Sequence, residues 1–253
     1  MLKKITLLRE RVEDWNSYPF SVPTIRELET IDLHSRVVFF AGENGTGKST
    51  LLEAIAGHYG FGPEGGNRNL QHDTTEHNHS TDALIRALRL SFDVRTGKGY
   101  FLRAESFFNT ATQLDELDTQ LDGPPILPSY GGISLHQRSH GETFFTLLTH
   151  KFQRNGLFLL DEPEAALSPQ RQLAFLVLMH DTLKRYKDAQ FIISTHSPVL
   201  LGFPKAQILS FDGGKLREIG YEETAPLQIV RHFVNHPDEF LEELFNEPKK
   251  LFD

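Results

Sequence analysis

Short apolar runs alternate with amphipathic segments along the second half of the chain. Residues 157–160 read Leu-Phe-Leu-Leu and residues 190–194 read Gln-Phe-Ile-Ile-Ser, and between them apolar positions in residues 169–186 recur at helical spacing. Apolar runs without polar alternation are typical of strands that are buried on both faces. The alternation of such strands with helices predicts an α/β fold with a mostly parallel sheet and crossover helices.

The same order begins earlier in the chain. Residues 36–41, Arg-Val-Val-Phe-Phe-Ala, form an apolar run that predicts a buried strand. Apolar residues from Leu51 to Ala56 recur at helical spacing, and Gly57 is expected to end that helix. A strand, a glycine-rich loop and a helix are therefore expected to follow one another here.

Two further segments have the pattern of hairpins, which would be antiparallel additions at the edge of the sheet. Residues 83–94 and 100–104 are expected to be strands joined by a turn at 96–99, and residues 206–211 and 216–219 flank the turn sequence Asp-Gly-Gly-Lys. The first ten residues are expected to form an edge strand. The other expected elements are helices at 107–121, 141–152, 226–234 and 237–245 and a loop at 128–132.

Composition narrows the class of protein. The formal net charge of −8 argues against a surface coated with nucleic-acid backbone, although it is compatible with a local basic patch. The absence of cysteine excludes disulfides, thiolate zinc sites and cysteine nucleophiles. No apolar stretch approaches the ~20 residues of a membrane span, and Arg9 and Glu10 interrupt the apolar start, which argues against a signal peptide. We therefore expect a cytoplasmic protein without direct membrane insertion.

The glycine-rich loop at residues 42–49 reads Gly-Glu-Asn-Gly-Thr-Gly-Lys-Ser, which is the pattern of a phosphate-binding loop. Gly45 and Gly47 allow a close backbone approach to a phosphate at a helix N-terminus. Lys48 would supply positive charge to the β- and γ-phosphates, and the Ser49 hydroxyl would ligate Mg²⁺. The alternative is an ordinary strand-to-helix turn, which the flanking elements disfavour. The expected nucleotide-binding residues of the loop are Asn44, Gly45, Thr46, Gly47, Lys48, Ser49 and Thr50.

Two carboxylates follow the apolar run at 157–160. Strands in a parallel sheet deliver their last side chains to the carboxyl edge, where open α/β sheets bind ligands. Asp161 there can hold Mg²⁺, and Glu162 is the better candidate for polarising the attacking water. The alternative is a strand that ends in helix-capping acids.

Three motifs make the sequence resemble the ATP-binding-cassette (ABC) class of ATPases over most of the chain. Residues 161–169, Asp-Glu-Pro-Glu-Ala-Ala-Leu-Ser-Pro, resemble the magnesium strand and the dimer-contacting loop of that class. Residues 139–142, Ser-His-Gly-Glu, are similar to its Ser-Gly-Gly-Gln signature, and residues 195–198, Thr-His-Ser-Pro, resemble its switch histidine. The resemblance implies one domain over residues 1–253, with a helical lobe at about 105–155 inserted in the core.

Five positions depart from the usual pattern of the class. Arg138 stands in place of leucine, His140 in place of the first signature glycine, and Glu142 in place of glutamine. Ser168 occupies a position where many transporters have aspartate. Glu164 is more typical of the soluble branch, which includes chromosome-maintenance, recombination and phage-defence ATPases.

The resemblance also implies a mechanism in which two subunits face head to tail and sandwich two nucleotides. Ser139 and the backbone of Gly141 would contact the γ-phosphate bound by the partner subunit. His196 would bind the γ-phosphate in its own subunit and help to hold the water near Glu162. Ser139 can instead be read as a helix N-cap, with Glu142 completing a capping box.

The sequence leaves three smaller assignments open. The ABC class has a metal-sensing glutamine between the loop lysine and the signature, and Gln71 and Gln113 are candidates for it. Glu105, at the end of an expected strand, is in a comparable position. The candidates for the aromatic ring that stacks on adenine are Trp15, Tyr18 and Phe20, with ordinary packing as the alternative. A histidine-rich stretch is read as a solvated loop in preference to a zinc site, and contains His72, His77 and His79.

These features together predict an ATPase that uses ATP and Mg²⁺, with Lys48, Glu162 and His196 as its catalytic residues. Closure and reopening of a homodimer would drive a partner protein in a soluble defence or repair module; the partner could be an effector, a nuclease or a permease. The alternatives are an ATP-binding subunit of a membrane transporter and a nucleotide-gated switch with little turnover. Nucleic-acid binding stays open, since no stripe of basic and aromatic residues points to it.

Overall fold

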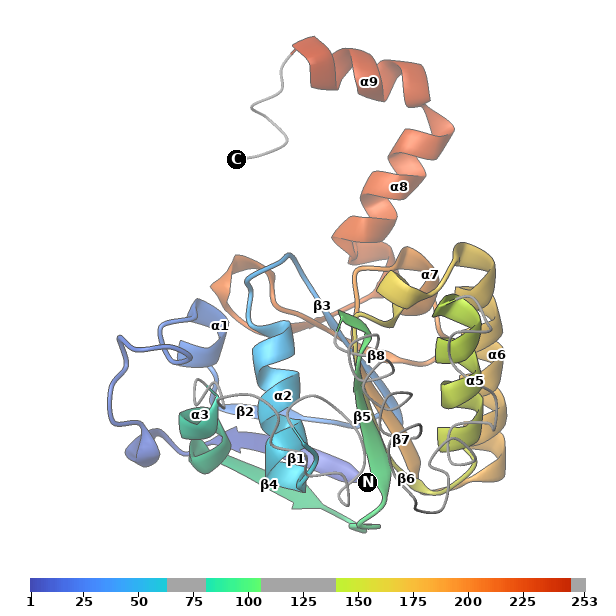
Figure 1. Cartoon of the computed structure of the whole chain (residues 1–253). Helices are drawn as coiled ribbons and strands as arrows, with labels where there is room; N and C mark the ends of the chain where they lie inside the picture. The colour runs from blue at the N-terminus through green and yellow to red at the C-terminus, as the bar shows by residue number, and fades with distance from the viewer. Residues whose placement is uncertain (63–80, 106–139, 247–253) are drawn as a thin grey trace, which may run out of the picture.

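The computed structural model describes residues 1–62, 81–105 and 140–246, and is drawn in Figure 1. Its main sheet has six strands in the order β5-β6-β7-β3-β8-β9. The strands β3 (Val37–Ala41), β5 (Gly99–Arg103), β6 (Gly156–Asp161), β7 (Ala189–Ser194) and β8 (Gln207–Ser210) run parallel, and β9 (Arg217–Ile219) pairs antiparallel with β8. This arrangement confirms the predicted parallel sheet and the predicted hairpin at 206–219.

A second sheet of three antiparallel strands lies beside the main one, with the order β2-β1-β4. It consists of β1 (Leu2–Leu7), β2 (Thr30–Asp32) and β4 (Leu88–Phe92). The prediction of an edge strand at the N-terminus is wrong, because β1 pairs with β2 on one side and with β4 on the other. An antiparallel subdomain is therefore present, as predicted, but it is built from different strands.

The predicted hairpin at 83–104 is also wrong. Residues 82–87 form the helix α3 (Asp82–Ala87), β4 follows it, and β5 pairs parallel with β6 in the main sheet. Gly99 shows why β5 joins that sheet: it has a φ of 148°, and a Cβ there would lie 1.9 Å from the carbonyl oxygen of Leu157. The close backbone approach between β5 and β6 thus requires glycine at the position that the sequence pattern assigns to a turn.

The helix after the phosphate loop is α2 (Lys48–Tyr59), and it runs past Gly57 to end at Gly60, whose φ is 98°. The expectation that Gly57 ends this helix is therefore wrong. A Cβ at Gly57 would lie 2.4 Å from Cδ1 of Ile85, so glycine at this position permits α2 to pack closely against α3. A left-handed glycine such as Gly60 is a common helix terminator.

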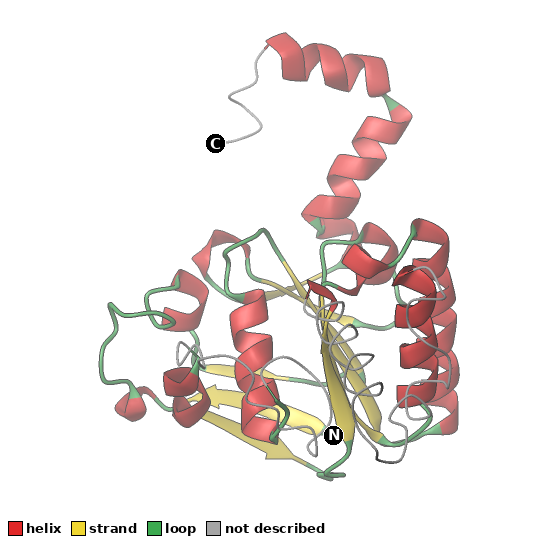
Figure 2. Ribbon diagram, in the orientation of Figure 1, coloured by secondary structure: helices red, strands yellow, loops and turns green. Residues whose placement is uncertain are grey.

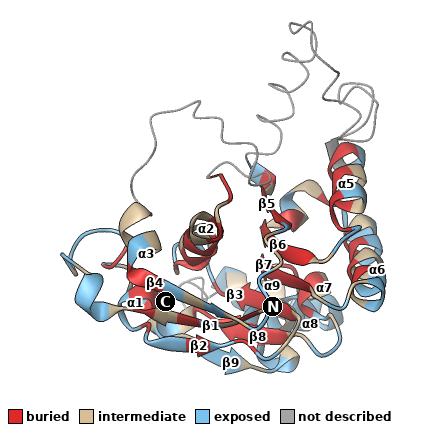
Figure 3. Cartoon of the chain, turned by 90° about the horizontal axis from the view of Figure 1, so that it is seen from below, coloured by how far each residue is buried: buried red, intermediate tan, exposed pale blue. Residues whose placement is uncertain are grey.

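Helices cover both faces of the main sheet (Figures 1 and 2). Successive side chains of a strand point to opposite faces, so Val38 and Phe40 pack toward α2 and the second sheet, while Val37 and Phe39 pack toward α5 and α6. The burial view in Figure 3 shows buried residues concentrated in the strands and the inner helix faces. On the α5–α6 side, the rings of Phe152, Phe158 and Phe191 pack against one another with centroids 4.8–5.1 Å apart.

The other helices are α1 (Pro23–Arg26), α5 (His140–Lys151), α6 (Pro169–Arg185), α7 (Pro198–Leu201), α8 (Ala225–Asn235) and α9 (Pro237–Asn246). The predicted helices at 141–152, 169–186, 226–234 and 237–245 are confirmed. The predicted helix at 107–121, the loop at 128–132 and most of the lobe expected at 105–155 lie outside the described residues. Within the described residues, no helix combines the length and the apolar character needed to cross a membrane.

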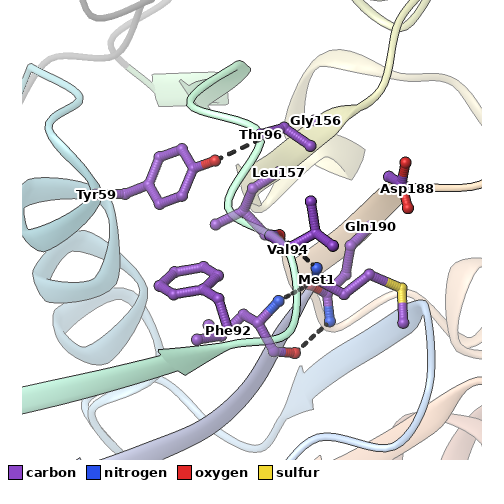
Figure 4. Close-up of a pocket in the computed structure, with 10 residues that line it drawn as sticks. Met1, Tyr59, Phe92, Val94, Thr96, Gly156, Leu157, Asp188 and Gln190 are labelled. Carbon is purple, nitrogen blue, oxygen red and sulfur yellow. Dashed lines mark hydrogen bonds between the residues drawn. The ribbon is translucent and has the colours of Figure 1, made fainter.

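Two buried glutamines join the two sheets. Gln190 of β7 accepts a hydrogen bond from the Leu2 amide at 2.7 Å and donates to the Leu2 carbonyl oxygen at 2.9 Å (Figure 4). Gln207 of β8 accepts from the His34 amide at 3.2 Å and donates to the Asp32 carbonyl oxygen at 2.9 Å. Each side-chain amide thereby satisfies backbone groups that the sheets leave unpaired.

A small cavity lies beside Gln190, between the two sheets, with Met1, Tyr59 and Phe92 in its lining (Figure 4). Its volume of about 10 Å³ is that of a single water molecule at most. The space between the sheets is therefore a packing defect and not a ligand site.

We predict that Gln190→Leu lowers the free energy of unfolding by about 1–3 kcal/mol, because it leaves the buried N–H and C=O groups of Leu2 without partners. Urea unfolding followed by circular dichroism would measure the change. Gln170→Leu is the matched control, because Gln170 is exposed on α6, and its effect should stay within about 0.5 kcal/mol. Equal stability of the two variants would show that Gln190 does not join the sheets energetically.

Candidate functional site

The phosphate-binding loop connects β3 to α2 at the carboxyl edge of the main sheet (Figure 1). Its glycines adopt positive φ angles, including 139° at Gly42 and 99° at Gly47. A Cβ at Gly47 would lie 3.0 Å from Cγ1 of Val22, so the segment before α1 presses against the loop. Asp212 fixes the other end, since its Oδ1 accepts a hydrogen bond from the Glu43 amide at 2.9 Å. The loop thus opens onto the N-terminus of α2, where helix N–H groups attract anions.

Lys48 is almost completely buried beneath this loop. Its Nζ donates a hydrogen bond to the Glu43 carbonyl oxygen at 2.6 Å. Burial lowers the pKa of Lys48, and the nearby carboxylates of Glu162 and Asp161 oppose that shift. The ammonium group is therefore held inside the loop by negative charge on the neighbouring strand end.

Ser49 and Asp161, the two predicted magnesium ligands, are in direct contact. The Ser49 hydroxyl donates a hydrogen bond to Asp161 Oδ1 at 2.9 Å. Burial raises the pKa of Asp161, and the bond from Ser49 and the charge of Arg103 oppose the rise. Oxygen ligands 2.0–2.1 Å from an octahedral Mg²⁺ lie about 2.9 Å apart at adjacent positions. The two side chains therefore fit neighbouring positions around such an ion.

Glu162 begins the turn after β6 in a left-handed conformation, with φ 48° and ψ 52°. This region costs a residue other than glycine about 1–3 kcal/mol, and such strain is concentrated at functional sites. The Glu162 amide donates to the Ser194 carbonyl oxygen at 3.0 Å, which fixes the turn against β7. The carboxylate is partly exposed, with Oε1 3.3 Å from Nε2 of His196.

His196 lies just after β7 and is held through its backbone. Its amide donates a hydrogen bond of 2.6 Å to Oε1 of Glu164, a largely buried carboxyl group whose pKa is raised by burial. Nε2 of His196 is itself buried and has no hydrogen-bond partner among the described residues, although it lies near Glu162. An unsatisfied buried nitrogen at this edge is suited to bind a ligand.

A second contact connects residues 195–197, which we call the histidine loop, to α6. Ser197 caps α7 by accepting hydrogen bonds from the Val199 and Leu200 amides, and its hydroxyl donates to Oε1 of Gln172 at 2.5 Å. Gln172 is buried in α6 and also donates to the Leu167 carbonyl oxygen at 3.1 Å. The histidine loop and the segment 163–168 are thus cross-linked by Glu164 and by Gln172.

A family model matches the part of the chain that carries Asp161, Glu162 and His196, and the match begins after the phosphate loop. Residues 72–202, which are 131 of the 253 residues, match the model described as "AAA domain, putative AbiEii toxin, Type IV TA system". The chain belongs to this family. Its membership confirms the resemblance to ABC-type P-loop ATPases that the motifs predict. No curated protein matches the chain.

Solved structures similar to this AAA-domain protein include an ATP-binding subunit of an ABC transporter, which is 17% identical with a TM-score of 0.47, over 92% of this chain and 93% of that one. The SMC head domain from Thermotoga maritima is 18% identical with a TM-score of 0.44, over 86% of this chain and 98% of that one. An SMC head bound to the C-terminal winged-helix domain of ScpA is 15% identical with a TM-score of 0.41, over 77% of this chain and 94% of that one.

The structure brings together Lys48, Ser49, Asp161, Glu162 and His196 at one edge of the sheet. Asn44, Gly45, Thr46 and Thr50 lie in or directly after the same loop, and Gly141 lies in the first turn of α5. Glu105 is exposed two residues beyond β5. The predicted residues outside the described part of the chain are Ser139, Gln71, Gln113, His72, His77 and His79.

Among the three aromatic candidates for adenine stacking, only Tyr18 is both exposed and beside the loop. Its hydroxyl is 2.8 Å from Oγ1 of Thr50, and 49% of the residue is exposed. Phe20 is buried, and Trp15 packs against it and under the guanidinium of Arg9.

Two further residues belong to the site without a signal in the sequence pattern: Arg103 and, in its contact role, Glu164. Arg103 is paired with Asp161 across β5 and β6, and its Nε lies 3.6 Å from Asp161 Oδ2 and its Nη1 3.4 Å from Glu53 Oε2. No local pattern indicates this, because it depends on the strand pairing. Glu164 was visible in the Asp-Glu-Pro-Glu motif, but its contact with the His196 amide was not.

We predict that Glu164→Met lowers the free energy of unfolding by about 1–3 kcal/mol, because a side chain of similar length no longer accepts the buried His196 amide. Glu164→Gln is the matched control: it keeps an oxygen acceptor, so its loss should be the smaller of the two. Chemical denaturation of both variants would measure this difference. If glutamine destabilises the protein as much as methionine does, the amide contact is not what makes Glu164 important.

Proposed function

We propose that this chain binds ATP with Mg²⁺ and hydrolyses it to ADP and phosphate. The observation that carries the proposal is the meeting of the Ser49–Asp161 pair with Lys48, Glu162 and His196 at one sheet edge. A buried lysine inside a glycine loop, two oxygen ligands and a carboxylate–histidine pair are the parts that phosphoryl transfer to water needs. Membership of a P-loop ATPase family supports the same conclusion.

Each side chain has a distinct task in this proposal. Lys48 and the loop amides hold the β- and γ-phosphates in place, and Ser49 and Asp161 would hold a Mg²⁺ that would neutralise charge on the phosphate oxygens. Glu162 accepts a hydrogen bond from the attacking water and orients it toward the terminal phosphorus. His196 donates from Nε2 to a γ-phosphate oxygen, which satisfies a nitrogen that has no hydrogen-bond partner among the described residues. Tyr18 would stack on the adenine.

In the described part of the chain, the site is partly exposed. About two fifths of the Glu162 side chain and one third of the His196 side chain are exposed. Catalysis needs water to be excluded and the γ-phosphate to be surrounded by donors. We infer that a second copy supplies them, with Ser139 and the Gly141 amide facing the phosphate bound by the first copy. The dimer would close on ATP and reopen after hydrolysis.

The process that this ATP cycle would drive is inferred from the family. The family description names a toxin of a type IV toxin–antitoxin system, which supports a role in a defence module where the ATPase drives a partner protein. The Glu164 acid of the soluble branch agrees with this role better than with transport.

We predict that Glu162→Gln reduces ATP turnover by about 10²–10⁴-fold, the range typical of a lost general base. ATP affinity should be retained, because Lys48 and Ser49 are unchanged. Phosphate release and equilibrium binding of a fluorescent ATP analogue would separate the two effects. Glu10→Gln, at an exposed position near the N-terminus, should leave turnover at the wild-type rate. Equal and negligible release from wild type and Glu162→Gln would instead favour a switch that binds ATP without turnover.

We also predict that turnover per chain rises with protein concentration, because each site needs groups from two copies. Ser139→Arg should abolish the rise by placing a bulky cation at the contact. Initial rates over a dilution series would show this. A rate per chain that stays constant on dilution, in a protein that hydrolyses ATP, would contradict catalysis by the dimer.

A further inference from the structure

The helices α8 and α9 extend beyond the carboxyl edge of the main sheet and away from its body (Figure 1). We call residues 225–246 the C-terminal arm. Neither helix contains a buried residue. The base of the arm packs against α7, whose first residue is Pro198, two positions after His196. The arm therefore starts next to the candidate catalytic edge.

The arm is amphipathic along both of its helices. On α8, Ile229, Val230, Phe233 and Val234 recur at helical spacing, and on α9 Leu241, Leu244 and Phe245 do the same. We call these side chains the apolar stripe of the arm, and 41–74% of Phe233, Val230, Ile229, Val234 and Phe245 is exposed. A single copy of the chain thus leaves apolar side chains of both helices in water, and a group of exposed apolar side chains marks an interaction site.

Contacts within the arm do not remove this exposure. The ring of Phe240 packs against Phe233 and His232, with centroids 5.7 and 5.3 Å apart, which joins α9 to α8. Helices of 11 and 10 residues are shorter than the about 12–15 residues at which an isolated helix becomes even marginally stable. Most of their stability must therefore come from burial of the apolar stripe against another surface.

The charge of the arm limits which kinds of surface its apolar stripe can contact. The polar side of α9 carries Asp238, Glu239, Glu242 and Glu243. Four carboxylates flanking the stripe disfavour the phosphates of nucleic acid or of an anionic membrane. They favour a protein surface that combines apolar side chains with positive charge.

The chain itself presents such a surface on α6. Outside the arm, the exposed large apolar residues of the described chain are Tyr18, Val94, Leu173 and Val177. Leu173 and Val177 lie one helical turn apart on α6 and are 57% and 60% exposed. The exposed Lys184 continues the same helix face, which also carries His180 and Asp181, a pair whose Nδ1 and Oδ1 atoms are 3.3 Å apart. The helix begins at Pro169, immediately after the segment 163–168 at the candidate catalytic edge.

We propose that the C-terminal arm of each copy docks through its apolar stripe on the α6 face of a second copy. This inference rests on the proposed function, which brings a second copy to the edge from which the arm extends. Two-fold symmetry then makes the contact twice, so both arms and both α6 faces are covered. The carboxylates of α9 face Lys184 and the neighbouring Arg185 across the contact.

The absence of native cysteine permits a direct test with single-cysteine chains. Copies carrying Val234→Cys are mixed with copies carrying Leu173→Cys, both in a Glu162→Gln background with ATP and Mg²⁺, and treated with a short bismaleimide. We expect the 234–173 product to dominate. Val94→Cys replaces Leu173→Cys in the matched control, because Val94 is 52% exposed and lies elsewhere. A control yield equal to the 234–173 yield, or a dominant 234–234 product, would overturn the proposal.

Sedimentation provides a second measurement. Val234→Asp together with Phe245→Asp should weaken self-association at least tenfold, and Val94→Asp should not change it. Equal association of these variants overturns the proposal, as does a wild-type chain that stays monomeric or an arm that binds anionic vesicles instead of a second copy. Phosphate release by wild type, measured alongside, tests the proposed function separately: hydrolysis that depends on Glu162 can persist when the arm contact fails.

Discussion

The alignment of three neighbouring parallel strands determines where the candidate site lies. In the paired register, Asp161 of β6 lies opposite Ser194 of β7, and Ser194 lies opposite Phe40 of β3. Each strand therefore ends at the same level, and each is followed by a functional segment: Glu162, His196 or the phosphate loop. A slip of one residue in any pair would turn Asp161 or its neighbours to the opposite face of the sheet. The fully buried apolar side chains of these strands hold the register. Packing in the core therefore determines where the residues of the candidate site lie.

In the turns that follow these strand ends, the backbone is held in conformations that it would not adopt alone. Glu162 is left-handed, and Gly42 and Gly47 have positive φ angles. Carboxyl groups of other segments stabilise these turns: Asp212 binds the Glu43 amide, and the largely buried Glu164 binds the His196 amide. A carboxyl group in such a place costs desolvation, as the raised pKa of Glu164 shows. That cost is accepted at the positions where loops must be fixed relative to one another, which is the requirement for preorganised catalysis.

The parts of this structure that could be predicted from sequence are those encoded by adjacent residues. The run Val37–Ala41, the glycine loop and the Asp161–Glu162 pair are local signals, and each lies where it was expected. The failures involve pairing between distant segments. Residues 83–87 satisfy a strand pattern locally but pack as a helix against Gly57, and β5 joins β6 instead of β4. Arg103 reaches Asp161 only through that pairing, so no local pattern could reveal it. Tyr18 is distinguished from Trp15 and Phe20 by its exposure and by its contact with Thr50, and both depend on the tertiary structure.

The polar links between the catalytic edge and α6 give the arm contact a route to the chemistry. Gln172 of α6 is buried, is followed in sequence by the exposed Leu173, and binds Ser197, the residue after His196. Gln172 also binds the Leu167 carbonyl in the segment that carries Glu164. A second copy that presses on α6 would therefore act on both anchors of the histidine loop, since α6 and the loop share rigid, buried hydrogen bonds. Association and nucleotide binding would then be coupled reciprocally: nucleotide that orders His196 would favour docking of the arm, and docking would favour nucleotide binding to the same extent.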